Sequence, residues 1–274
     1  CGVVVLKRLE DAVRDGDPIR AVVRGSAMNQ DGRSSGLTAP NGPAQTAVIE
    51  AALRNAGLSG DRVGMLEAHG TGTPLGDPME MQAAIAALRP SSNSSSSSSS
   101  GSSSSGGRVL RVGSIKSNIG HAEAAAGVAG LIKAVLSVER GVIPGHLHFE
   151  KLNPAIGELP GDVCVGVESV GWEEEERVAG VSSFGFSGTN CHVVISNAPA
   201  RTVSSSLPPS ISLSPLPLFL SAHDASALAT VRNDTLALLS RDTLAAGCST
   251  LALRRSHWHH RLVLWHDGEA SVAS

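Results

Sequence analysis

The sequence predicts a layered α/β domain with a mixed sheet. Three short β-rich runs are each followed by a glycine-containing turn or loop and then by a helical pattern. Repeated strand–turn–helix units of this kind imply right-handed crossovers. Two further β-rich stretches and a last strand follow the third helix, at residues 163–167, 178–181 and 192–195. We expect these closing stretches to add antiparallel strands at one edge of the sheet.

The first unit begins the chain. Residues 3–6 and 19–23 are rich in β-branched residues and predict strands, with a short helix between them. A polar loop follows at residues 29–36. Pro43 then opens a helix that Gly57 ends, since proline favours the first helical position and glycine the position after the last. Its apolar residues fall on one face: Val48, Ala52, Leu53 and Ala56.

The next two units repeat this plan. Residues 63–66 predict a strand, and Asp77 is interpreted as the cap of a helix with Pro78 at its first position and Glu80 three residues after the cap. Ile85 and Leu88 lie on the apolar face of that helix. The third unit has a strand at residues 109–112, a turn, and an alanine-rich helix that ends near residue 138.

Two segments differ in character from this core. Residues 91–105 are almost entirely serine, a composition that cannot bury apolar area and predicts disorder. From residue 199 the sequence becomes rich in serine and proline and then contains further helical and apolar stretches. We interpret residues 201–274 as a connector or a small accessory element.

Composition and charge exclude several classes of function. The formal charge is −3, from 22 Lys+Arg and 25 Asp+Glu, which gives no electrostatic case for binding nucleic acid or anionic membranes. The longest nearly apolar stretch, 128–136, is far shorter than the roughly 20 residues that span a bilayer. The four cysteines have no short paired spacing, which favours a reducing, cytoplasmic setting over disulfides or zinc. The chain begins at Cys1 in an apolar run and is interpreted as a fragment of a longer protein.

Two histidines at glycine-rich turns are the main candidates for chemistry. The motif EAHGTGT at residues 67–73 places His69 after a strand, and KSNIGH at residues 116–121 places His121 after the next. Ligands of α/β proteins bind at the carboxyl ends of strands, and imidazole exchanges protons near neutral pH. A structural role in a tight turn is the alternative for each histidine. Lys116 is either a surface charge or the partner of a carboxylate, for which Glu67 and Glu123 are candidates.

Other candidate sites carry weaker signals. The glycines after His69 approach a dinucleotide-binding pattern, but the spacing is wrong by one and Pro74 interrupts the turn. Phe186, between two glycines, is either part of a hairpin turn or a gate over a pocket. Cys191 and His192 point to opposite faces of a strand and cannot readily pair, and no other cysteine stands out as a nucleophile. The histidines at residues 257–260 favour a solvent-facing basic patch over a metal site.

Together these motifs resemble the β-ketoacyl synthase family, specifically the ketosynthase domain of type I polyketide synthases. The resemblance covers residues 1 to about 198 apart from the serine-rich insert. It rests on the two histidine turns and on four other stretches: GVVVLKRL (2–9), RGSAMNQDG (24–32), LTAPNGP (37–43) and SFGFSGTN (183–190). The remaining tail resembles the linker that leads from a ketosynthase to an acyltransferase.

The resemblance implies the thiolase-like, layered α/β/α/β/α architecture, made of two similar halves. Residues 1–20 would end the N-terminal half. Residues 21–198 would form the C-terminal half with a mixed sheet and a disordered serine-rich insert at 89–107, and residues 199–274 would be the linker.

The resemblance also implies an activity, decarboxylative Claisen condensation of an acyl thioester with a malonyl-type thioester. His69 and His121 would be the catalytic histidines and Lys116 would order the site. Thr71 and Thr73 would bind the phosphopantetheine arm, and Phe186 would be the gate. No cofactor would bind directly; the implied partners are acyl carrier protein, neighbouring domains such as an acyltransferase, and a second copy in a homodimer.

The nucleophilic cysteine of the family lies on an upstream turn that this sequence lacks. We therefore expect the chain alone to be inactive. A non-catalytic dimerisation or carrier-docking module derived from a ketosynthase is the alternative, and a nucleotide-binding protein is a third hypothesis.

Overall fold

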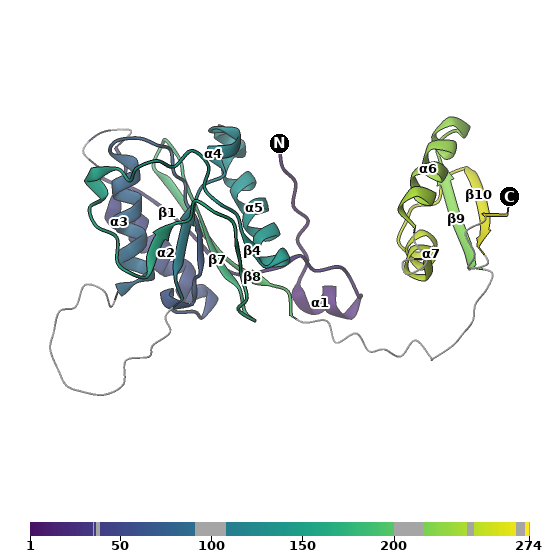
Figure 1. Ribbon diagram of the computed structural model, residues 1–274, viewed down its shortest axis with the longest axis horizontal. Coiled ribbons are helices and arrows are strands. Elements are labelled where there is room, and N and C mark those ends of the chain that lie inside the picture. Colours follow the sequence, from purple (N-terminus) through teal and green to yellow (C-terminus); the bar gives the residue numbers. More distant parts are fainter. Residues whose placement is uncertain are drawn as a thin grey trace. The chain divides into compact units, whose positions relative to one another are not determined.

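The computed structural model forms two compact units, Cys1–Arg201 and Thr202–Ser274 (Figure 1). The residues that it describes are 1–34, 36, 39–90, 108–199, 216–239, 244–266 and 272–273. The predicted disorder at 91–107 lies outside the described residues.

A six-stranded mixed sheet forms the centre of the first unit. Its order is β1-β8-β7-β2-β3-β5. The strands are β1 (Ala21–Gln30), β2 (Met65–Glu67), β3 (Leu110–Gly113), β5 (Val163–Val165), β7 (Val178–Phe184) and β8 (Thr189–Asn197). β8 pairs antiparallel with both β1 and β7, whereas β7, β2, β3 and β5 run parallel. Antiparallel pairing therefore lies at one edge, as expected, where β8 pairs with β1 and β7. Of the other two closing stretches, however, β7 pairs parallel with β2, and β5 adds a parallel strand at the opposite edge.

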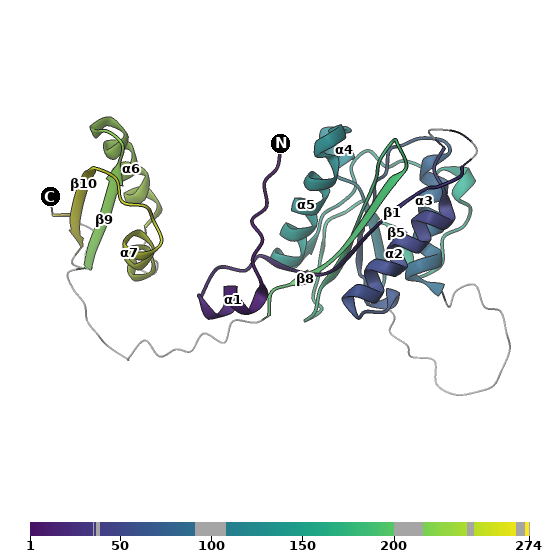
Figure 2. The same cartoon turned by 180° about the vertical axis from the view of Figure 1, so that it is seen from behind.

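Helices cover both faces of this sheet (Figures 1 and 2). α2 (Gly42–Ala56) and α3 (Gly76–Leu88) bury their apolar residues in one cluster with Leu66, while α5 (Ala126–Arg140) packs in a second cluster with Met65. Met65 and Leu66 are neighbours in β2, so their side chains point to opposite faces. Because side chains alternate between the two faces of β2, this strand contributes to the hydrophobic clusters on both faces of the sheet.

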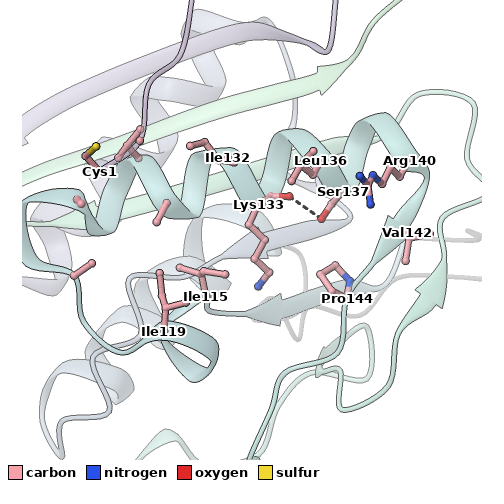
Figure 3. Close-up of a pocket in the computed structure, with 15 residues that line it drawn as sticks. Cys1, Ile115, Ile119, Ile132, Lys133, Leu136, Ser137, Arg140, Val142 and Pro144 are labelled. Carbon is pink, nitrogen blue, oxygen red and sulfur yellow. Dashed lines mark hydrogen bonds between the residues drawn. The ribbon is translucent and has the colours of Figure 1, made fainter. Parts of the chain in front are cut away.

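Short elements connect these layers. They are α1 (Leu9–Arg14), η1 (Gly60–Arg62), α4 (Lys116–Ile119), η3 (Glu123–Ala125), β4 (Val142–Ile143), η4 (Pro154–Ile156) and β6 (Val170–Gly171). β4 and β6 form a separate two-stranded sheet. One side of α5 lines an apolar groove of about 530 Å³, which Cys1 and Ile119 also line (Figure 3).

Two local predictions were wrong. Residues 3–6 are not a strand, and the neighbouring Cys1 is exposed. No described strand pairs with this segment, so Val5 stays 93% exposed. Asp77 does not cap α3: Leu75 occupies the cap position, and the Asp77 carboxylate accepts the N–H of Gly72 at 2.9 Å instead.

Arg89, which the prediction placed at the start of the disordered insert, is instead buried at the end of α3. Its guanidinium donates to the carbonyls of Gly60, Val63, Leu88 and Arg108. It also lies 3.1 Å from the Asp162 carboxylate. These bonds connect the end of α3, before residue 91, to Arg108, which follows residue 107.

The second unit has its own small core. A three-stranded sheet, β11-β10-β9, is formed by β9 (Leu216–Ala222), β10 (His260–His266) and β11 (Val272–Ala273). It packs with α6 (Ala225–Leu238) and α7 (Leu244–Leu253), and the buried residues are Leu218, Leu220, Leu244, Cys248 and Leu264. The histidines at residues 257–260 are exposed. Among the described residues there is no group of three potential metal ligands, and no helix that is long and apolar enough to cross a bilayer.

A glycine at the bulge of β1 provides a test of this packing. The register of β1 against β8 shifts between Val23 and Gly25, where a Cβ on Gly25 would lie 2.6 Å from the carbonyl oxygen of Ala52 in α2. We expect Gly25→Ala to lower the free energy of unfolding by about 1–3 kcal/mol, because α2 must move off the sheet. Urea unfolding measures this loss. Gly171→Ala, at a position with open space around it, is the matched control, and equal stability of the two variants would contradict this contact.

Candidate active site

The predicted site residues lie at one edge of the sheet. β2, β3 and β7 are parallel, so their carboxyl ends meet there. His69 follows β2 by two residues, Lys116 follows β3 by three, and Phe184 is the last residue of β7. The topology therefore brings three segments that are distant in the sequence to one place, where α/β proteins hold ligands.

His69 contacts both His121 and Lys116. The ring centroids of the two histidines are 5.3 Å apart, with the planes at 85°. The Nζ atom of Lys116 lies 3.5 Å from Nδ1 of His69. The ring of Phe184 packs edge-on against His69 with a centroid distance of 5.9 Å.

A buried carboxylate shapes the His69 turn. The two oxygens of Glu80, on α3, accept the backbone N–H groups of His69 at 2.7 Å and of Gly70 at 2.8 Å. Gly70 and Gly72 have φ angles of 49° and 74°, which favour glycine. A Cβ at Gly70 would also lie 2.9 Å from Ser114, next to the Lys116 segment. The turn can therefore approach β3 closely while Glu80 holds its backbone.

The backbone also orients the His121 ring. Glu123 has a φ of 46°, uncommon for a residue with a side chain, and its N–H donates to Nδ1 of His121 at 3.0 Å. A neutral imidazole whose Nδ1 accepts a hydrogen bond carries its proton on Nε2. The left-handed conformation at Glu123 thus selects the Nε2–H tautomer of His121.

Burial and positive charge keep His69 neutral. Burial, then Lys116, then His121 lower the pKa of the His69 imidazole to about 4. Burial also lowers the pKa of Lys116, an effect that Glu80 and Glu67 oppose. Burial raises the pKa of Glu80 to about 7, although its backbone N–H donors favour the carboxylate. Because an ammonium has only donors, its contact requires Nδ1 of His69 to accept and Nε2 to carry the proton.

The arrangement can stabilise a developing oxyanion. Two imidazoles in edge-to-face contact, each with an acceptor Nδ1, can each offer an Nε2–H donor. Fixed donors of this kind stabilise negative charge on a carbonyl oxygen more than water does, because they need no reorganisation during the reaction.

The other predicted residues are exposed on neighbouring turns. The hydroxyls of Thr71 and Thr73 lie 3.2 Å apart on the surface, and Thr73 also accepts the N–H of Gly76 at 3.0 Å. Phe186 is 81% exposed at the turn that follows β7. Its role as a gate and those of the two threonines stay predictions.

Sequence reasoning missed three features of the site. Glu80 was interpreted only as part of a helix cap, although an acidic residue at the start of the helix after a glycine turn is also placed to bind that turn. Phe184, rather than Phe186, contacts His69. Glu67 was considered as a partner of Lys116, but its hydrogen-bonded partner is Lys133 on α5, at 2.6 Å.

The absence of a Cys191–His192 pair is confirmed. His192 is fully buried on β8, and its Nδ1 lies 2.9 Å from the hydroxyl of Ser182 on the neighbouring strand. Among the described residues, no cysteine forms a hydrogen bond with His69 or His121.

Comparison with known proteins decides the family. Residues 20–150 match the profile of the C-terminal domain of β-ketoacyl synthases, and residues 153–263 match the ketoacyl-synthetase C-terminal extension. The chain belongs to the β-ketoacyl synthase family. The first profile contains both histidine turns and Lys116. The family resemblance predicted from the motifs is therefore confirmed.

Curated relatives are large polyketide synthases. The chain is 45% identical over 277 residues to erythronolide synthase EryA3 of Saccharopolyspora erythraea, an alignment that covers 99% of this chain and 8% of that protein. It is 51% identical over 199 residues to a phenolphthiocerol/phthiocerol polyketide synthase of Mycobacterium tuberculosis, covering 72% of this chain and 8% of the relative. The chain is thus a ketosynthase C-terminal region and spans about 8% of the length of these relatives.

Solved ketosynthases have the same fold. The oxazolomycin ketosynthase domain OzmH KS7 of Streptomyces albus matches with a TM-score of 0.79 and 34% identity, over 95% of this chain and 43% of that one. The ketosynthase from module 1 of the bacillaene synthase of Bacillus amyloliquefaciens matches with a TM-score of 0.80 and 30% identity, over 95% and 46%. The thiolase-like α/β fold class is confirmed.

Titration of His69 tests the electrostatics of this site. We expect the ring of His69 to stay neutral down to about pH 4. Lys116→Met removes the ammonium but keeps a long side chain, and should move the midpoint toward the ordinary value of about 6.5 without reaching it, because burial remains. NMR signals of the histidine rings between pH 3 and 8 give the midpoints. Lys151→Met, at an exposed position, is the control, and a midpoint near 6.5 in the unaltered chain would contradict a buried site.

Proposed function

We propose that this chain supplies the decarboxylating part of a ketosynthase active site. The reaction is the condensation of an acyl thioester with a malonyl-type thioester, in which acyl carrier protein presents the malonyl group on its phosphopantetheine arm. The edge-to-face contact between His69 and His121, with Lys116 and the Glu123 N–H at their Nδ1 atoms, is the observation that carries the proposal.

The geometry fits the first step of that reaction. When the malonyl carboxylate leaves as CO₂, the electron pair of the broken C–C bond moves into the thioester, and negative charge collects on the carbonyl oxygen. His69 and His121 donate to that oxygen and stabilise the enolate. The Lys116 ammonium keeps the His69 proton on Nε2 and adds positive potential. The enolate carbon then attacks the acyl thioester carbonyl, which forms the new C–C bond and expels a thiolate.

The cysteine that carries the acyl group as a thioester is assigned to a segment outside this chain. Cys1 is exposed and Cys191 lies on β8, and among the described residues neither these nor the other two cysteines form a hydrogen bond with His69 or His121. We therefore assign the nucleophile to a cysteine outside this chain and expect no condensation by this chain alone. No bound cofactor is required, because the thioester activates the substrate and the two histidines bind its oxygen.

Surface residues fit the presentation of substrate on a long arm. The exposed hydroxyls of Thr71 and Thr73 would bind the amides of phosphopantetheine, and Phe186 would cover the entrance. By analogy with the large relatives, the partners are acyl carrier protein, an adjoining acyltransferase and a second ketosynthase in a homodimer.

The release of CO₂ from a carboxyl-labelled malonyl thioester tests this function. In a ketosynthase that joins this chain to a cysteine-bearing N-terminal half, His69→Ala and His121→Ala should each lower the rate by roughly 10²–10³-fold, the cost of losing one oxyanion donor. His259→Ala, at an exposed position in the second unit, should leave it unchanged.

Two outcomes would contradict the proposal. An unchanged rate of CO₂ release in both histidine variants would show that His69 and His121 do not stabilise the enolate. Condensation product from the isolated chain would show that the nucleophile lies within it.

A further inference from the structure

A buried ion pair lies directly behind the two histidine turns. Glu67, the last residue of β2, is 1% exposed. One oxygen of its carboxylate accepts from Nζ of Lys133 at 2.6 Å, and the other accepts the backbone N–H of Ile115 at 2.6 Å. Figure 3 shows the Lys133 side chain leaving α5 toward the segment that carries Ile115.

Glu67 and its partner Ile115 each lie next to a residue of the proposed site in the sequence. Glu67 precedes His69 by two residues, and Ile115 directly precedes Lys116. Lys133 belongs to α5, the helix that follows the His121 turn. One carboxylate therefore links the segments that carry His69 and Lys116 to α5, the helix that follows the His121 turn.

The packing around Glu67 leaves little freedom. A Cβ on Gly130 of α5 would lie 3.0 Å from Cγ of Glu67, so the glycine permits the helix to approach this side chain. An unpaired carboxylate is costly inside a protein. Burial raises the pKa of Glu67, whereas Lys133 and the Ile115 N–H lower it. The Glu67 carboxylate thus needs Lys133 and the Ile115 N–H to remain charged, and its hydrogen bonds hold these two groups close to it.

We propose that the Glu67–Lys133 pair is a positioning pair that keeps the His69 and Lys116 turns at the separation that the two-histidine site requires. The pair contacts no substrate and acts through the backbone. This inference rests on the proposed function for its purpose, but its geometry can be measured without any thioester.

The test uses the 274-residue chain and NMR of its histidine rings. Glu67→Gln keeps the size and an oxygen for Ile115 but removes the ion pair, and Lys133→Met removes the other charge. We expect both variants to lose the direct proton contacts between the rings of His69 and His121. The His69 midpoint, about 4 in the unaltered chain, should rise by about one pH unit or more as water reaches the ring.

Two further variants separate positioning from general stability. Lys133→Arg keeps a cation at the same place and should retain the ring contact. Glu176→Gln removes a carboxylate that pairs with Arg24 and Arg62 near the opposite end of β7. It is the matched control for the loss of an ion pair, and should leave the His69 midpoint and the ring contact unchanged whatever it does to the unfolding temperature.

The outcomes are distinct. Altered His69 and His121 signals in Glu67→Gln or Lys133→Met, with normal signals in Glu176→Gln, support the positioning role. Unchanged ring contact and midpoint in both site variants would overturn it, even with a lower unfolding temperature. Failure of the proposed function would show instead in the CO₂ assay, where the histidine variants would stay active.

Discussion

The hydrogen bonds from the His69 and Gly70 backbone to the buried Glu80 carboxylate are the interaction on which the site depends. They hold a turn whose glycines adopt left-handed angles, and this turn sets the direction of the His69 ring. Two backbone N–H groups buried without an acceptor would cost about 1–3 kcal/mol each. Glu80 therefore links the start of α3 to the ring that contacts His121, and a helix that belongs to the core also holds the turn of a proposed catalytic group.

The same logic applies across the site, where backbone groups and buried charges decide which proton each histidine carries. The Glu123 N–H occupies Nδ1 of His121, and the Lys116 ammonium faces Nδ1 of His69. Both rings are thereby left as Nε2–H donors. Burial keeps His69 uncharged, which suits a group that must donate a hydrogen bond rather than a full proton. The parallel strands β2, β3 and β7 bring these parts together because all three end at one edge of the sheet.

Much of this arrangement could be predicted from the sequence, because strands, glycine turns and amphipathic helices are encoded locally. The helix ended by Gly57, the mixed sheet and the convergence of His69 with His121 follow from such patterns. The predictions that were wrong concern features that depend on contacts between residues distant in the sequence. Residues 3–6 have the composition of a strand but no described strand to pair with, and Asp77 and Glu80 bind the preceding turn rather than capping α3. Arg89 was predicted to belong to the serine-rich insert, but its buried guanidinium binds four carbonyls. The ion pair between Glu67 and Lys133 joins residues 66 positions apart, so no local sequence pattern indicates it.

The tautomers of the two histidines test the account most directly. Long-range ¹H–¹⁵N NMR spectra of the imidazole rings at pH 7 distinguish a protonated from an unprotonated ring nitrogen. The hydrogen bonds predict an unprotonated, accepting Nδ1 and a proton on Nε2 at both His69 and His121. An Nδ1–H tautomer or a doubly protonated ring at either histidine would contradict the claim that this edge of the sheet presents two oxyanion donors.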